Sequence, residues 1–181
     1  MSKSTKGFTL IELVITLAVA AVIISVALPG FQRLIQNNRV AAIGDEFTAA
    51  LTYARMEALK QARRVSICAS NDGLVCTADW SEGYIVFVDS AASDTALPDP
   101  TLGALKKWGA RTNGTSLTAR FDGVTDTNYI RFTPLGSFAR PAGGETRVEV
   151  DVLIADCNGI NVPRITVGMT GMVSSVGRNC P

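Results

Sequence analysis

The sequence predicts an α+β fold, in which a long N-terminal helix with a transmembrane first half packs on a mainly antiparallel β-sheet domain. Three observations lead to this class. An apolar run fills residues 8–28, helical spacing of apolar residues continues to residue 64, and short strand-like segments separated by turns fill residues 65–181. The length of 181 residues allows one domain with a substantial core and leaves little room for a second.

A short basic leader precedes the apolar run. The leader, residues 1–7 with the sequence MSKSTKG, contains two lysines, which favour a cytoplasmic N-terminus. The run from Phe8 to Leu28 would be about 30 Å long as a helix, which is the thickness of a bilayer core. We therefore expect a membrane span, with the rest of the chain outside the inner membrane. Cleavage at the Gly7–Phe8 junction would remove the leader and keep the span.

One carboxylate, Glu12, lies inside the apolar run near its start. A charged side chain in hydrocarbon costs at least about 2–3 kcal/mol, so such a residue is rarely without a function. Cleavage before Phe8 would create an α-amino group four residues before Glu12, close to one helical turn away. A neighbouring subunit, shifted along a filament axis, could bring its amine against this carboxylate and neutralise both charges. We expect an unpaired Glu12 to favour assembly.

The segment KGFTLIEL, residues 6–13, resembles the class III signal of type IV pilins and type II secretion pseudopilins. The resemblance implies the type IV pilin fold, removal of the leader by a prepilin peptidase after Gly7, and N-methylation of Phe8. It also implies that residues 8–29 form a transmembrane and assembly helix, in which Phe8 and Glu12 act in assembly.

A second helical segment follows the span. Pro29 and Gly30 are expected to kink the helix, because proline removes a backbone hydrogen bond and glycine adds flexibility. Residues 30–64 then form the amphipathic helix of the exposed domain. Its apolar face, which a sheet would cover, contains residues at three- and four-residue steps: Phe47, Leu51, Ala54 and Ala58.

Residues 65–181 are expected to form the C-terminal β domain. The clearest strand candidates are VSICAS (65–70), GYIVFVD (83–89), TARFDG (118–123), YIRFTP (129–134), TRVEVDVLIAD (146–156) and RITVGM (164–169). Within TRVEVDVLIAD, apolar residues alternate with Glu149, Asp151 and Leu153, as in a strand packed on one face. Turns and one longer surface loop are expected between the strands, at residues 71–73, 112–114, 142–144 and, for the loop, 90–103.

A second resemblance concerns ICASNDGLVCTADWSEGYIVFVD, from Ile67 to Asp89. This segment resembles the signature of the FimT/FimU/GspH branch of minor pilins and pseudopilins, in which cysteines flank a polar turn. The signature continues with a Trp, a Gly and a strand ending in Phe-x-Asp, matched here by Trp80, Gly83, Phe87 and Asp89. IRFTPLGS and RITVGMTGMVSSVGRNC resemble later segments of the branch. With the N-terminal motif, the resemblance covers most of the chain and points to minor pilins of the FimU kind.

The cysteines indicate the compartment. Cys68, Cys76, Cys157 and Cys180 form no CxxC pair, and the sequence contains no His, so a mixed zinc site is excluded. We expect two disulfides in an extracytoplasmic compartment. Four cysteines allow three pairings. A Cys68–Cys76 bridge needs only a hairpin, so we favour it together with Cys157–Cys180, while the other two pairings stay open.

The charge of the β domain bears on nucleic-acid binding. The domain has nine Lys and Arg residues against twelve Asp and Glu residues, a net charge of −3, whereas nucleic-acid binding normally needs a basic patch. The FimT members implicated in DNA uptake resemble this chain and carry a C-terminal Gly-Arg-x-Arg motif, but here Cys180 takes the second Arg position. A patch formed by Arg164, Arg178 and a lysine is the candidate DNA contact, and DNA binding is not favoured.

The residue types do not favour an enzyme. Without His, the chain lacks the usual general base and every Ser-His-Asp or Cys-His arrangement. The sequence has no phosphate-binding glycine loop. The twelve carboxylates of the β domain are expected to be surface charge, and no two of them are spaced as an acid/base pair. We therefore expect no catalytic residue, no metal site and no cofactor.

The resemblances together imply a function and a location. They imply a minor type IV pilin that assembles with other minor pilins into a complex initiating or capping the pilus, which supports twitching motility. The implied partners are the other minor pilins, the major pilin, the prepilin peptidase and the inner-membrane assembly platform. The implied location is the inner membrane, with a single span and a periplasmic C-terminal domain, and the cell surface after assembly. Two alternatives stay open: a GspH-like type II secretion pseudopilin, and a DNA-binding minor pilin for natural transformation.

Overall fold

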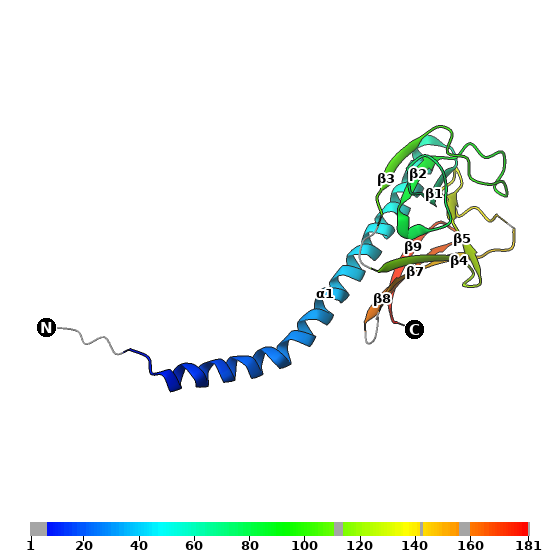
Figure 1. Cartoon of the computed structure of the whole chain (residues 1–181). Helices are drawn as coiled ribbons and strands as arrows, with labels where there is room; N and C mark the ends of the chain where they lie inside the picture. Colours follow the sequence, from blue (N-terminus) through cyan, green and yellow to red (C-terminus); the bar gives the residue numbers. More distant parts are fainter. Residues whose placement is uncertain (1–6, 111–113, 142, 156–159, 181) are drawn as a thin grey trace. The chain divides into compact units, whose positions relative to one another are not determined.

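The computed structural model describes residues 7–110, 114–141, 143–155 and 160–180. Its elements in chain order are α1 (Leu10–Gln61), β1 (Val65–Ala69), the 3-10 helix η1 (Trp80–Glu82), β2 (Tyr84–Val88), β3 (Ala104–Trp108), β4 (Thr115–Phe121), β5 (Thr125–Thr127), β6 (Tyr129–Phe132), β7 (Arg147–Ile154), β8 (Asn161–Gly168) and β9 (Val173–Asn179) (Figure 1). The chain divides into two compact units, with the boundary between Asn38 and Arg39. We call residues 7–38 the helical unit and the described residues from 39 to 180 the β unit.

The helix α1 is continuous through Pro29 and Gly30. It ends at Gln61, shortly before the predicted limit at residue 64. The kink expected at Pro29 and Gly30 stays a prediction.

Within the β unit, α1 buries one face against the sheets. The buried residues recur at helical spacing and are Val40, Gly44, Phe47, Ala50, Leu51, Ala54 and Ala58. All four apolar residues predicted for this face belong to the buried set, so that prediction is confirmed.

Two antiparallel sheets complete the β unit (Figure 1). The first sheet has the strand order β3-β2-β1-β6 and the second has the order β5-β4-β7-β8-β9. In the first sheet, Ile67 of β1 lies opposite Val86 of β2 and Ile130 of β6. In the second sheet, Val150 of β7 lies opposite Ile165 of β8. The predicted class, a long helix packed on antiparallel sheet, is thus confirmed.

A close approach joins α1 to β8. A Cβ atom added to Gly44 would lie 2.5 Å from Cγ of Pro163, so only glycine fits at this point of the helix. Pro163 also lies at the end of the β7–β8 ladder, whose last pair is Asp151 and Arg164. Proline has no N–H to donate, which explains why the ladder stops there.

Four aromatic rings connect the helix with both sheets. The ring of Phe47 lies edge-on to Trp80 and to Tyr84, at 5.4 and 5.0 Å between centroids. Tyr84 in turn stacks on Trp108 at 4.9 Å. The indole Nε1 of Trp80 donates a hydrogen bond of 2.9 Å to the carbonyl of Thr127 in β5, which belongs to the second sheet. Edge-to-face pairs of this kind add to the stability gained from burial alone.

The two central strands of the first sheet, β1 and β2, are buried on both faces. All five residues of β1 and all five of β2 are buried. One face packs in the main core with the helix, and the other forms a smaller apolar cluster of Cys68, Ile85, Phe87 and Tyr129. A disulfide between Cys68 and Cys76 borders this second cluster.

Two strands were not expected from the sequence, and both have little buried apolar surface. β3 is mostly exposed along its length, so its sequence ALKKW shows no apolar alternation. β5 has three residues, too few for a periodic pattern. β9 was expected only from the resemblance of RITVGMTGMVSSVGRNC to a segment of the branch, and it is also largely exposed.

The alternation predicted in β7 is correct for its apolar residues and wrong for Asp151. Val148, Val150 and Val152 are buried against the core. Asp151, expected on the solvent face, is 6% exposed. Arginines from β8 and β9 cover its carboxylate and satisfy its charge, which makes the burial tolerable.

Candidate assembly site

The start of α1 is capped by Thr9. The backbone N–H of Glu12 donates to Thr9 Oγ1 at 3.3 Å, and the N–H of Leu13 donates to the carbonyl of Thr9 at 3.2 Å. A threonine at the cap followed three residues later by glutamate is the sequence pattern of a capping box. Sequence inspection missed this role, although the pattern T-x-x-E was visible. Phe8, immediately before the cap, is 80% exposed.

The helical unit exposes its whole apolar surface. Every residue from Gly7 to Ile35 is exposed, and Glu12 is the only charged residue of the sequence between Gly7 and Gln32. The helix is long and apolar enough to cross a membrane, with a mean hydropathy of 2.7 in its most apolar window. Two hydroxyls in this stretch, those of Thr16 and Ser25, donate to carbonyls of the same helix at 2.8 Å. Both hydroxyls are thereby hydrogen-bonded without a partner from outside the helix.

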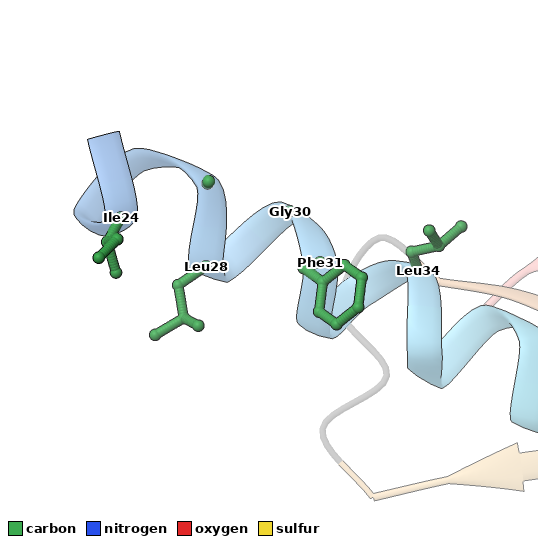
Figure 2. A pocket seen from close by; sticks show the side chains of 6 residues that line it. Ile24, Leu28, Gly30, Phe31 and Leu34 are labelled. Atoms are coloured by element: carbon green, nitrogen blue, oxygen red, sulfur yellow. The ribbon is translucent and has the colours of Figure 1, made fainter. Parts of the chain in front are cut away.

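An apolar hollow lies on this surface beside Gly30 (Figure 2). Its lining side chains lie along the helix, those of Ile24 and Leu28 on one side of the glycine and those of Phe31 and Leu34 on the other, as Figure 2 shows. A Cβ added to Gly30 would meet no atom within 4 Å, so nothing in the described chain fills the space. Small residues of this kind let another helix approach closely.

The disulfide prediction is confirmed for one bridge. Cys68 and Cys76 are bonded, with Cα atoms 5.6 Å apart. Cys180 is disulfide-bonded as well. Its predicted partner, Cys157, lies outside the described residues, so the Cys157–Cys180 bridge stays a prediction.

The signature segment between Ile67 and Asp89 forms structural elements. Trp80 is 2% exposed and Phe87 is fully buried, so both are core residues. Gly83 has a φ of 120°, and a Cβ there would lie 2.6 Å from the carbonyl oxygen of Trp108. The position therefore requires glycine.

Asp89 ends the signature and forms a buried ion pair. Its Oδ2 accepts hydrogen bonds from Nε of Arg131 at 2.8 Å and from the hydroxyl of Ser66. Its Oδ1 accepts from the backbone N–H groups of Ala91 and Asp99. Both charged side chains are completely buried. Sequence reasoning treated the carboxylates of this domain as surface charge, which is wrong for Asp89.

The same arginine anchors the surface loop of residues 90–103. Nη1 of Arg131 donates to the carbonyls of Ser93 and Asp94 at 3.0 and 2.7 Å. Arg64 also pairs with the Asp94 carboxylate at 2.6 Å. The loop is therefore fixed to the first sheet by charge as well as by the chain.

The arginines considered for DNA contact are engaged with carboxylates. Arg164 forms two hydrogen bonds with Asp151, at 2.8 and 2.9 Å, and pairs with Glu149 at 3.1 Å. Arg178 pairs with Asp151 at 2.9 Å, and Arg147 pairs with Glu149 at 2.7 Å. The hydrogen bonds that Arg164 donates to Asp151 raise the pKa of the arginine above its ordinary value. Charges neutralised within the protein contribute less to phosphate binding, so this patch does not favour DNA as a ligand.

A metal site is not evident either. In the described ranges, no group of three or more Cys, Asp or Glu side chains is arranged to hold a metal ion. The candidate functional features of the described residues are therefore the capped N-terminus of α1 and the exposed apolar surface of the helical unit.

Comparisons with known proteins agree with this organisation. The family described as "Type II transport protein GspH" matches residues 44–171, and the "Prokaryotic N-terminal methylation motif" matches residues 2–28. No curated protein matches the chain. The methylation motif implies processing by a prepilin peptidase and assembly with other pilins, and the apolar helix is consistent with a membrane-anchored prepilin.

Solved structures share the fold. Two crystal structures of the type IV minor pilin FimU from Pseudomonas aeruginosa are 22% and 24% identical to this chain, with TM-scores of 0.56 and 0.50. The matches cover 77% and 75% of this chain and 89% and 91% of FimU. The minor pseudopilin EpsH from the type 2 secretion system of Vibrio cholerae is 8% identical with a TM-score of 0.51, covering 78% of this chain and 98% of EpsH. The chain therefore belongs to the GspH family, and it is a structural minor pilin or pseudopilin of a type IV pilus or type II secretion system, not an enzyme.

Proposed function

We propose that this chain is a minor type IV pilin, which joins other minor pilins in a complex that initiates or caps the pilus and supports twitching motility. The observation that carries the proposal is the fully exposed apolar helix from Leu10 to Ile35 behind a capped N-terminus. So much apolar surface is stable only when a bilayer or other helices surround it. A pilin meets both environments in turn.

Before assembly, the chain is a single-pass protein of the inner membrane with the β unit in the periplasm. The Cys68–Cys76 disulfide supports this location, because disulfides persist in oxidising compartments. After assembly, the same helix lies among the helices of the filament and the β unit reaches the cell surface. The partners are other minor pilins, the major pilin and the inner-membrane assembly platform.

Glu12 favours the transfer of the helix from the bilayer to the filament. Placing its charge in the membrane costs at least about 2–3 kcal/mol. The positive end of α1 returns only about 0.3–1 kcal/mol to an acid in the first turn, so the cap at Thr9 does not offset this cost. The mature α-amino group of Phe8 in a neighbouring subunit would neutralise the carboxylate, and at low dielectric a well-placed pair offsets far more. Assembly is therefore the state in which Glu12 is best satisfied.

A type II secretion pseudopilin is the second candidate. The observations that favour it are the description of the matching family as a type II transport protein and the fold shared with EpsH. The N-terminal chemistry is the same in both systems, so it does not separate them. The higher sequence identity to FimU than to EpsH supports the pilus.

Deletion of the gene tests the two candidates in one strain. We expect surface pili and twitching to be lost, with type II secretion intact, and both phenotypes to return with the wild-type gene. Pili would be measured in the sheared surface fraction, and secretion by exoprotein activity in the medium. Loss of secretion with normal pili would select the pseudopilin, and a strain normal in both would refute both candidates.

A further inference from the structure

The last strand, β9, forms one edge of the second sheet and has an open side. It pairs only with β8 in the strand order β5-β4-β7-β8-β9. The N–H of Cys180 donates to the carbonyl of Ile160, and the N–H of Gly168 donates to the carbonyl of Met172. In an antiparallel ladder, hydrogen-bonded pairs alternate with pairs that do not exchange bonds. Met172 and Cys180 both belong to hydrogen-bonded pairs, and the register between them is unbroken. The even-numbered residues of β9 are therefore the ones whose backbone groups bond to β8.

The odd-numbered residues therefore direct their backbone groups away from the sheet. Val173, Ser175, Gly177 and Asn179 each present an N–H and a C=O at the open side. Across the described part of the chain, no hydrogen bond joins these groups to another segment. The edge thus offers a row of donors and acceptors with the spacing of a β-strand.

The other sheet edges are blocked in the ways that proteins ordinarily use. β3 has Lys106 and Lys107 side by side, and charged lysines on an edge discourage strand pairing. β5 has only three residues, and β6 has four and forms a bridge with Phe138. β9 has seven residues, no proline and one charge, Arg178, whose guanidinium pairs with Asp151.

The surroundings of β9 indicate what would pair with it. Val176, at the middle of the strand, is 66% exposed and would be covered by a second strand. Arg178 does not face the open side, because its guanidinium reaches inward across β8 to Asp151 of β7. An incoming strand with an apolar residue beside Val176 would bury this exposed side chain.

We propose that the open edge of β9 is a docking site for an extended strand of a different pilin of the same filament, one that carries an apolar residue beside Val176. Pairing through backbone groups gives affinity, and the side chain that packs beside Val176 gives selectivity. The inference rests on the proposed function, because it supplies the contact by which the β unit recognises its neighbour.

A proline at the edge tests the backbone contact. Ser175→Pro removes one outward N–H and leaves the bonds to β8 intact, a position at which sheets tolerate proline. We expect incorporation of this variant into sheared pili to fall about tenfold, as for one lost and unpaired backbone hydrogen bond. Ser175→Ala keeps the N–H and is the matched control, expected at the wild-type level. Normal incorporation of Ser175→Pro, or an equal loss for both variants, would overturn the proposal.

A photo-crosslinking side chain at position 176 identifies the partner without depending on that variant's stability. We expect an adduct with another pilin in the full-length protein in cells, and none from position 124, which is 82% exposed at the β4–β5 turn, beside the opposite edge of the sheet. Adducts with a second copy of this chain, or equal yields at both positions, would overturn the proposal. The two hypotheses separate cleanly. If deletion abolishes pili while Ser175→Pro restores them, only the β9 site fails, and a deletion strain with normal pili rejects the pilin function itself.

Discussion

Replacing Asp89 by Ala should destabilise the β unit more than any surface substitution. The change leaves Arg131 charged and completely buried, without its carboxylate partner. It also leaves the N–H groups of Ala91 and Asp99 and the hydroxyl of Ser66 without their acceptor. Breaking a buried ion pair from one side costs about 3–5 kcal/mol. For a chain of this size, each kcal/mol lowers Tm by about 2–4 °C, so we expect a decrease of roughly 6–20 °C.

Thermal unfolding of the full-length protein in detergent measures this effect. Near-UV circular dichroism reports on Trp80 and Trp108, both of which pack within the β unit. The matched control is Arg120→Ala, which breaks an ion pair of the same length with Asp126 on the surface, where the side chains are 43% and 76% exposed. Exposed pairs contribute about 0–1 kcal/mol, so this variant should unfold within a few degrees of the wild type.

The comparison between the two variants shows whether the buried ion pair contributes more stability than a surface ion pair. If Asp89→Ala and Arg120→Ala lose the same stability to within about 1 kcal/mol, the buried pair is not what fixes the 90–103 loop to the first sheet. A loss confined to Asp89→Ala supports that role.

Three further predictions concern stability. Gly44→Ala places a Cβ 2.5 Å from Pro163 and should cost about 1–3 kcal/mol in chemical denaturation, whereas Gly109→Ala, with no atom within 4 Å, should change stability little. Cys68→Ser opens a disulfide loop whose ends are eight residues apart and should lower the free energy of unfolding by about 2–3 kcal/mol, and reductant should destabilise the variant less than the wild type because only the bridge of Cys180 is left to reduce. Hydrogen bonds from the hydroxyl and N–H of the threonine before β7 lower the pKa of Asp122 below its usual 3.8 in the folded protein. The folded state then binds this proton less readily than the unfolded state, so the stabilisation is present above about pH 4 and is lost as pH falls through the folded pKa. Asp122→Asn should accordingly flatten the acid limb of a stability–pH curve, and an unchanged slope would contradict this.

Periodicity and motif together predicted the helix and most of the strands. The apolar face of α1 was predicted correctly because its four residues recur at helical steps and lie against one continuous core. The strands β1, β2 and β6 were found because their buried residues are apolar on one or both faces. β3 and β5 were not predicted, because an exposed strand and a strand of three residues show no alternation of apolar and polar residues.

The polar interior was harder to predict from the sequence. Asp89 and Asp151 look like surface acids, and only the fold brings Arg131 to one and Arg164 to the other, across 42 and 13 residues of chain. Pairings of this kind depend on strand order and register, which no local pattern specifies. The cap at Thr9, by contrast, follows from a four-residue pattern and could have been predicted.

Incorporation of a Glu12→Ala variant into filaments tests whether the Glu12 carboxylate drives assembly. Thr9→Ala, which removes the cap hydroxyl but keeps the carboxylate, is the control for helix stability. The amount of each protein is compared between the membrane fraction and sheared pili, with cleavage checked by mass. We expect Glu12→Ala to be inserted and processed but absent from pili, whereas Thr9→Ala should enter them. Glu12→Ala in pili at the wild-type level would contradict this expectation.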